Sequence, residues 1–249
     1  CGRVRGHGDR LMVRFGIWSV AAMVLAACGG AGDAPHARAT TVGIAPDAFA
    51  VRGCGDPGRC ALIVAGGKTL LVGASSGVGA ALGDDIDQID MVLLPALDAA
   101  TIEGLDEVRN RGWTSGRREA LAVAGPVGTG DLVRGLNAAF ETSDAIAQVK
   151  INPPGGYGAA LLAAADVSGT NRPTVFNTGD LVVELERGAR FEATFLVRYG
   201  GTVLAVASCE SQSALSGATH RLTCSAPVQD ESGTVPVLWP GKDDVVFVE

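Results

Sequence analysis

Histidine is scarce in this chain of 249 residues, and its scarcity restricts the metal chemistry open to the protein. The three histidines are His7, His36 and His220, and the first two lie in the N-terminal segment, ahead of the part expected to fold. Only one imidazole can therefore belong to the folded domain. Catalytic zinc is commonly held by several imidazoles, so the sequence cannot supply a zinc site of that kind.

The chain is also short of positive charge, and it lacks the cysteine spacing of a structural zinc site. The chain has 20 Lys and Arg against 27 Asp and Glu, a formal net charge of −7. A nucleic-acid partner is therefore not expected, because it requires a basic surface. We interpret the one basic cluster, Arg109, Arg111, Arg117 and Arg118, as a solvated loop surface. No two cysteines have the C-x₂-C spacing that structural zinc sites use.

The N-terminal apolar run, Phe15 to Ala27, is too short to cross a bilayer and is typical of a signal-peptide core. We interpret residues 1–11 as sequence upstream of a true start at Met12. The run ends in Leu25-Ala26-Ala27-Cys28, which resembles the bacterial lipobox, where cleavage before the cysteine is followed by lipid attachment to its sulfur. An ordinary secretory signal with a chance cysteine, or a short buried helix, remains an alternative.

This pattern predicts three segments. Residues 1–27 are upstream residues and signal peptide, residues 28–46 are a lipid-anchored flexible tether rich in glycine, and residues 47–249 form one domain. The predicted location is the bacterial cell envelope, on the periplasmic face or the cell surface, with the membrane as partner through lipidated Cys28. Gly29 is not the aspartate that resembles an inner-membrane retention signal, so the outer membrane is favoured.

Four further cysteines form two pairs that are close in sequence, Cys54 with Cys60 and Cys209 with Cys224. Exported domains commonly oxidise such pairs, so both are disulfide candidates. The connectivity is inferred from proximity along the chain alone.

Short β-rich runs alternate with glycine turns throughout the predicted domain, and two helices interrupt them. The helices are expected at Thr101 to Asn110 and Asp131 to Phe140, whereas residues 153–173 have no clear pattern. The expected strands are Phe49 to Arg52, Cys60 to Val64, Thr69 to Val72, Met91 to Leu94, Ala120 to Ala124, Leu181 to Leu185, Ala193 to Tyr199, Thr202 to Ala207 and Val245 to Val248. Because no strict βαβ rhythm is present, the pattern predicts an α/β (α+β) fold of two facing sheets with helices outside.

A glycine-rich turn, Gly73 to Gly79 after the run Leu70 to Val72, looks like the cofactor turn of a short-chain dehydrogenase. The Tyr-x-x-x-Lys pair of that family falls on Leu222 and Ala226, neither of which can move a proton. Dinucleotide binding without hydride transfer is kept as a second alternative.

Several segments in order along the domain resemble metallo-β-lactamase-fold proteins of the ribonuclease Z type. These segments are Cys60 to Gly77, Ile89 to Leu94, Gly112-Trp113 followed by Gly116 to Arg118, Leu121 to Thr129, Gly135 to Phe140, Val197 to Leu204 and Asp243 to Glu249. The resemblance implies a four-layer αββα sandwich of two mixed β-sheets, metallo-β-lactamase-like. It also implies a zinc site in active members.

The metal-binding positions of that family are degenerate in this chain. Where active members carry Thr-His-x-His-x-Asp-His, the sequence has Ala96, Asp98, Ala100 and Thr101 at the four ligand positions. The aspartate of the family's glycine turn corresponds to Gly73, and its bridging aspartate falls near Ser208. The resemblance therefore implies no catalytic residues, no metal ligands and no cofactor. A weak hard-cation site made of Asp98, Glu103, Glu210 and His220 is an alternative to plain surface carboxylates.

The sequence thus predicts a non-catalytic lipoprotein of this fold, a pseudoenzyme that acts as an envelope binding or scaffold module for a protein or small-molecule ligand. A metal-dependent hydrolase of ester or phosphodiester bonds with an altered site is the first alternative. The dinucleotide binder is the second.

Overall fold

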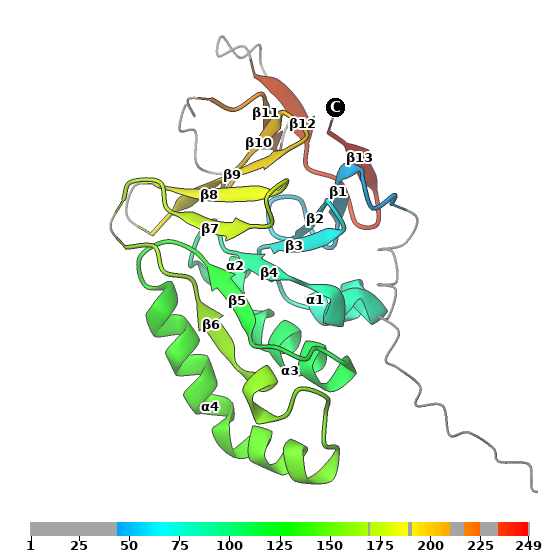
Figure 1. Cartoon of the computed structure of the whole chain (residues 1–249), viewed down its shortest axis with the longest axis vertical. Helices are drawn as coiled ribbons and strands as arrows, with labels where there is room; N and C mark the ends of the chain where they lie inside the picture. Colours follow the sequence, from blue (N-terminus) through cyan, green and yellow to red (C-terminus); the bar gives the residue numbers. More distant parts are fainter. Residues whose placement is uncertain (1–43, 169, 189–190, 210–216, 225–233, 249) are drawn as a thin grey trace, which may run out of the picture. The chain divides into compact units, whose positions relative to one another are not determined.

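A computed structural model describes residues 44–168, 170–188, 191–209, 217–224 and 234–248 (Figure 1). The lipidation candidate Cys28, the signal-peptide segment and most of the tether lie outside these residues. Of the helices that it describes, none is both long enough and apolar enough to span a membrane.

The first sheet has seven strands in the order β13-β1-β2-β3-β4-β5-β6. Strands β1 to β3 pair antiparallel, as does β13 with β1, whereas β3 to β6 run parallel, so the sheet is mixed. Its strands are β1 (Phe49–Gly53), β2 (Ala61–Ala65), β3 (Lys68–Val72), β4 (Met91–Leu93), β5 (Leu121–Ala124), β6 (Leu162–Ala164) and β13 (Val245–Phe247).

The second sheet has six strands in the order β12-β11-β10-β9-β8-β7 and is also mixed. Strands β7 to β10 pair antiparallel, and β10, β11 and β12 run parallel. Its strands are β7 (Thr174–Asn177), β8 (Val182–Arg187), β9 (Ala193–Tyr199), β10 (Thr202–Val206), β11 (His220–Thr223) and β12 (Val235–Leu238).

The two sheets face each other across the main hydrophobic core. Alternate residues of β2 and β3, such as Ile63 and Leu70, meet Phe195 of β9 and Leu204 of β10 in one buried cluster. Full burial of each large apolar side chain stabilises the fold by about 1.5–3 kcal/mol. The predicted α+β fold of two mixed sheets is confirmed.

Helices cover the other face of the seven-stranded sheet, where they bury a second cluster that includes Leu71, Val92 and Leu105 (Figure 1). The helices are α1 (Val78–Leu82), η1 (Gly83–Gln88), α2 (Ala99–Ile102), α3 (Leu105–Ser115), α4 (Thr129–Lys150) and η2 (Tyr157–Ala160). All helices in the described residues lie between β3 and β6 in sequence. The second helix layer implied by the resemblance is not formed by any segment that the structure describes.

The helix expected at Thr101 to Asn110 is two helices, α2 and α3, divided at Gly104. A Cβ at Gly104 would lie 2.2 Å from the carbonyl oxygen of Ser75, so the chain approaches the β3–α1 turn too closely for a side chain. Helix α4 continues to Lys150, ten residues past the predicted end, and four strands were missed. These are the short strands β6, β7, β11 and β12.

The interpretation of the basic cluster as a solvated loop is wrong for two of its members, because Arg109 and Arg117 are 0% and 7% exposed. Arg117 donates to the carbonyl oxygens of Val108 and Arg109 in α3 and of Ala159 in η2, and so links the two helices. Burial, and secondly the charge of Arg109, lower the pKa of Arg117 to about 10, so its guanidinium remains charged at neutral pH.

Candidate functional site

A cleft of about 660 Å³ opens where strands of the two sheets end. Its described walls are the loop after β4, the start of α4, the residues before β9, the residues after β10 and the loop between β1 and β2. The backbone N–H of Ala193 donates to the carbonyl oxygen of Pro95 over 2.8 Å and joins the two sheets at this point. The lining comprises Gly58, Arg59, Pro95, Ala96, Leu97, Asp98, Thr101, Gly128, Phe191, Glu192, Ser208 and Cys209.

The structure brings to this cleft several of the positions that the resemblance equates with metal ligands. Ala96, Asp98, Thr101 and Ser208 all line it. Gly73 lies close to Thr101, because a Cβ built at Gly73 would be 3.7 Å from the Thr101 Cγ2 atom. Ala100 lies in the first turn of α2 and is not among the lining residues.

Asp98 is occupied by hydrogen bonds from its own helix and from a distant arginine. It is the N-cap of α2, and its carboxylate accepts from the Thr101 backbone N–H at 3.1 Å and from the Thr101 hydroxyl at 2.8 Å. The Nη1 atom of Arg59 lies 3.0 Å from Asp98 Oδ1. A guanidinium therefore provides the positive charge beside this carboxylate.

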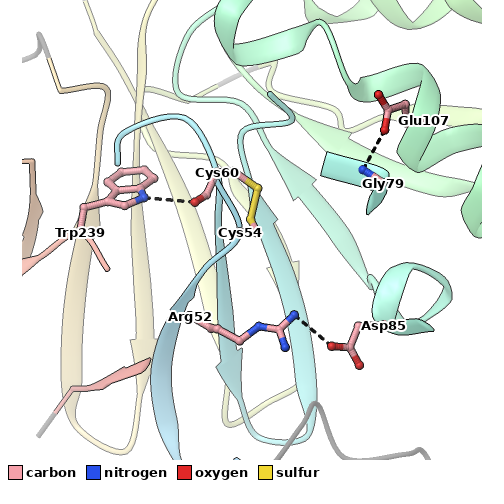
Figure 2. The surroundings of a disulfide bond; sticks show 7 residues. All are labelled: Arg52, Cys54, Cys60, Gly79, Asp85, Glu107 and Trp239. Atoms are coloured by element: carbon pink, nitrogen blue, oxygen red, sulfur yellow. Dashed lines mark hydrogen bonds and ion pairs between the residues drawn. A yellow bond between two sulfur atoms is a disulfide. The ribbon is translucent and has the colours of Figure 1, made fainter. Parts of the chain in front are cut away.

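Arg59 reaches the cleft from a small loop closed by the predicted disulfide between Cys54 and Cys60, which the structure confirms with a Cα–Cα distance of 5.1 Å. The carbonyl oxygen of Cys60 accepts a hydrogen bond from the Trp239 indole N–H at 3.2 Å (Figure 2). Sequence reasoning did not single out Arg59. The sequence feature that could have indicated it is that Arg59 is the one basic residue between Cys54 and Cys60.

The second predicted disulfide, Cys209 with Cys224, also contributes to the cleft. It packs against the first loop, because a Cβ at Gly58 would lie 2.0 Å from the Cys209 Sγ atom. The two cross-linked loops are therefore neighbours in the wall of the cleft.

Gly73, which the resemblance equates with a ligand aspartate, stands where no side chain fits. Its φ is +67°, and a Cβ there would lie 2.3 Å from the carbonyl oxygen of Arg59. The loop that carries Arg59 thus fills the space that an aspartate at this position would need.

The residues present do not fit the dinuclear zinc site implied by the fold. No group of three or more His, Cys, Asp and Glu side chains in the described part of the chain could hold a metal ion. The lining offers Asp98 and Glu192 but no imidazole, and its cysteine is in a disulfide. Such a site ordinarily needs imidazoles and carboxylates that converge.

The alternative hard-cation site is not assembled either. His220 lies at the start of β11, paired with Leu204 of β10, and its Nδ1 atom is 3.0 Å from the Thr219 hydroxyl. It does not line the cleft with Asp98, and neither does Glu103. Glu210 lies outside the described residues.

The glycine turn after β3 is already paired with an acidic side chain. The backbone N–H groups of Gly77 and Gly79 donate to the Glu107 carboxylate at 3.2 and 2.9 Å, and Figure 2 shows the second of these bonds. Helix α1 that follows has only five residues. The Glu107 carboxylate therefore occupies the N–H groups that a pyrophosphate would need, and its negative charge would repel one.

Solved structures resemble this arrangement, whereas no protein-family model and no curated protein matches the chain. Human tRNase Z, short form, is 13% identical, with 70% of this chain and 76% of that chain covered and a TM-score of 0.51. The fold is metallo-β-lactamase-like. The metallo-β-lactamase fold protein YhfI from Bacillus subtilis is 14% identical, with 76% and 78% covered and a TM-score of 0.48. The likeness to tRNase Z concerns the fold alone.

Proposed function

We propose that this chain is a non-catalytic binding module with a metallo-β-lactamase-like fold, anchored in the bacterial envelope by a lipid on Cys28. The observation that carries the proposal is the combination of an open cleft of about 660 Å³ with an Arg59–Asp98 ion pair at a degenerate metal position. The cleft provides room for a ligand. The side chains around it do not provide the means to activate water.

The chemistry of the cleft supports binding over hydrolysis. A bound metal ion lowers the pKa of its water and polarises the bond under attack. The Arg59 guanidinium stabilises negative charge but cannot generate a hydroxide nucleophile in this way. The Thr101 hydroxyl is directed at Asp98, and no histidine or lysine among the lining residues could act as its base.

The walls of the cleft suit a ligand site that is formed before binding. Two disulfides hold neighbouring parts of the lining, which limits the conformational entropy that a ligand must remove. Leu97, Pro95 and Phe191 give the lining an apolar part, and Phe191 is 63% exposed. Pockets that combine apolar surface with a few polar groups are the usual form of small-molecule sites.

A hydrolysis panel tests the non-catalytic part of the proposal. The purified protein is assayed with bis(p-nitrophenyl) phosphate and p-nitrophenyl butyrate in added Zn²⁺, Mn²⁺ or Ca²⁺, beside the Asp98→Asn variant. We expect both proteins to match the buffer rate. Turnover in the unmodified protein that Asp98→Asn abolishes would overturn the proposal in favour of an altered metal-dependent hydrolase.

A labelling experiment tests the anchor. Cells of a Gram-negative host that express the full chain are fed radiolabelled palmitate, and the Cys28→Ser variant is treated in parallel. We expect label and membrane association in the first and their loss in the second. Equal membrane association of both proteins without label would contradict lipid attachment at Cys28.

A further inference from the structure

The polar groups of the cleft are not all satisfied by the protein. Asp98 has donors on both carboxylate oxygens, from Arg59 and Thr101. The Arg59 side chain is 39% exposed and directs its Nη1 atom to Asp98, so other N–H groups of its planar fork remain for a ligand. The Ser208 Oγ atom is buried and has no hydrogen-bond partner.

A buried hydroxyl without a hydrogen-bond partner is uncommon in proteins. Ser208 lines the cleft although its Oγ atom is covered, and one rotation about χ1 redirects a serine hydroxyl. After that rotation the Ser208 hydroxyl would be a second hydrogen-bonding group beside Arg59.

Charged groups of both signs surround the cleft. Arg59 is the basic side chain of the described lining, and Gly128 in the lining directly precedes α4, a helix of 22 residues whose N-terminal end is electropositive. Asp98 and Arg59 offset each other's charge. Glu192 in the lining and Asp131 in the first turn of α4 reduce affinity for an anion, so recognition of an anion rests on the directed N–H groups of Arg59 and not on net charge.

We propose that the cleft binds a small amphipathic anion, with a carboxylate or phosphate head on Arg59 and Ser208 and an apolar body against Leu97 and Phe191. This inference rests on the proposed binding function and names the class of ligand for it. A guanidinium is well suited to both heads, since it donates two parallel hydrogen bonds to planar or tetrahedral oxyanions.

Isothermal titration calorimetry with four ten-carbon probes tests the head group. The purified protein is titrated with decanoate, decyl phosphate and decylammonium below their micelle concentrations, and with decanol below its solubility limit. We expect binding of at least one anion, at least about tenfold tighter than decanol or decylammonium. The anion that binds more tightly then shows whether the cleft prefers a carboxylate or a phosphate head. Binding of decanol or decylammonium as tight as that of both anions overturns the inference.

Substitutions in the cleft locate the head. Arg59→Gln is expected to weaken binding of the preferred anion by about tenfold or more, Arg59→Lys by less, and Ser208→Ala by about threefold. The control is Arg118→Gln, which removes the same charge from an exposed side chain outside the cleft and should change nothing. Unchanged affinity in Arg59→Gln, with its circular dichroism unaltered, would contradict the proposed contact.

The inference and the proposed function fail in different experiments. Absence of binding for both anions at about millimolar concentration rejects the amphipathic anion as ligand but does not support the hydrolase alternative. Metal-dependent turnover of the nitrophenyl substrates rejects the non-catalytic module whatever the calorimetry shows.

Discussion

Two arginine–aspartate pairs in this molecule have the same chemistry and opposite surroundings. Arg109 and Asp144 join α3 to α4 with side chains 0% and 2% exposed, whereas Arg59 and Asp98 meet at the cleft with side chains 39% and 48% exposed. The buried pair has no access to solvent or to a ligand, so its contribution is to the fold. The exposed pair keeps hydrogen-bonding capacity that a ligand can use.

The contacts of the buried pair are complete. Arg109 donates to both oxygens of Asp144, its guanidinium lies 5.1 Å from the Phe140 ring centroid, and it also donates to Asn110 and Asn137. Loss of one partner from such a pair leaves an uncompensated buried charge. Burial, and not the pair itself, should therefore decide how much each carboxylate contributes to stability.

The largest effect is expected from Asp144→Ala. Removing the carboxylate leaves Arg109 charged and buried, so the free energy of unfolding should fall by about 3–5 kcal/mol in urea denaturation. Asp131→Ala is the matched control, because Asp131 pairs with Arg134 on the same helix with both side chains at least 75% exposed. It should cost less than about 1 kcal/mol. Equal losses in the two variants would break the comparison.

Gly73→Ala should sharpen the comparison by showing that the cleft wall is rigid although its ion pair is exposed. The new Cβ would meet the Arg59 carbonyl oxygen at 2.3 Å, so we expect a loss of about 2–3 kcal/mol and a displaced Arg59 loop. Gly67→Ala has the same φ of +67° with no atom within 4 Å of the new Cβ and should cost about 1 kcal/mol. Thermal denaturation of both variants measures the difference. Identical losses would mean that the loop carrying Arg59 moves to accommodate the new Cβ, which would contradict a rigid cleft wall.

Glu107 is a carboxylate of intermediate burial that accepts from the N–H groups of Gly77 and Gly79. Glu107→Gln should lower the free energy of unfolding by about 1 kcal/mol, because a neutral amide is a weaker partner for these two donors. The control is Glu103→Gln, at an exposed carboxylate four residues earlier, which should change stability by less than about 0.5 kcal/mol. Urea denaturation of both variants is the measurement, and an equal or smaller loss in Glu107→Gln than in Glu103→Gln would contradict a stabilising role for these two hydrogen bonds.

Arg59→Gln should have a small effect on stability, below about 1 kcal/mol, because the pair that it breaks is exposed. The measurement is urea denaturation beside Asp144→Ala. A loss as large as that of the buried pair would show that Arg59 is a structural residue, and the distinction between the two pairs would no longer hold.

The smallest effect concerns Asp180, an exposed carboxylate whose pKa is lowered chiefly by the hydrogen bond from the Thr178 hydroxyl and then by backbone donors. Because the folded pKa lies below its ordinary value, Asp180 stabilises the fold above that value. This contribution disappears as the pH falls through the folded pKa. Asp180→Asn should therefore reduce the loss of thermal stability between about pH 5 and about pH 2, and an unchanged pH profile would contradict the assignment.

The sequence could predict the strands with continuous apolar runs, since β2, β3 and β4 are buried on both faces and carry little ambiguity. It could not predict β7, which has no buried residue, or β12, which has one, because these strands form through pairing with β8 and β11. Pairing between distant segments is a tertiary effect that local pattern does not encode.

The candidate site also has parts that the sequence could predict and parts that depend on tertiary contacts. Both disulfide pairs follow from sequence proximity, and Ala96, Asp98, Thr101 and Ser208 could be placed by resemblance. Arg59 could not, because its contact with Asp98 spans 39 positions and depends on how the loop from Cys54 to Cys60 folds onto the end of β4. The burial of Arg109 likewise depends on Asp144, 35 positions away.

The most direct measurement is the zinc content of the purified protein after equilibrium dialysis against Zn²⁺, determined by mass spectrometry for the unmodified chain and for Asp98→Asn. If the Arg59–Asp98 pair takes the place of a metal centre, both proteins should retain well below about one zinc ion per chain. One or two ions per chain in the unmodified protein, lost in Asp98→Asn, would contradict the account.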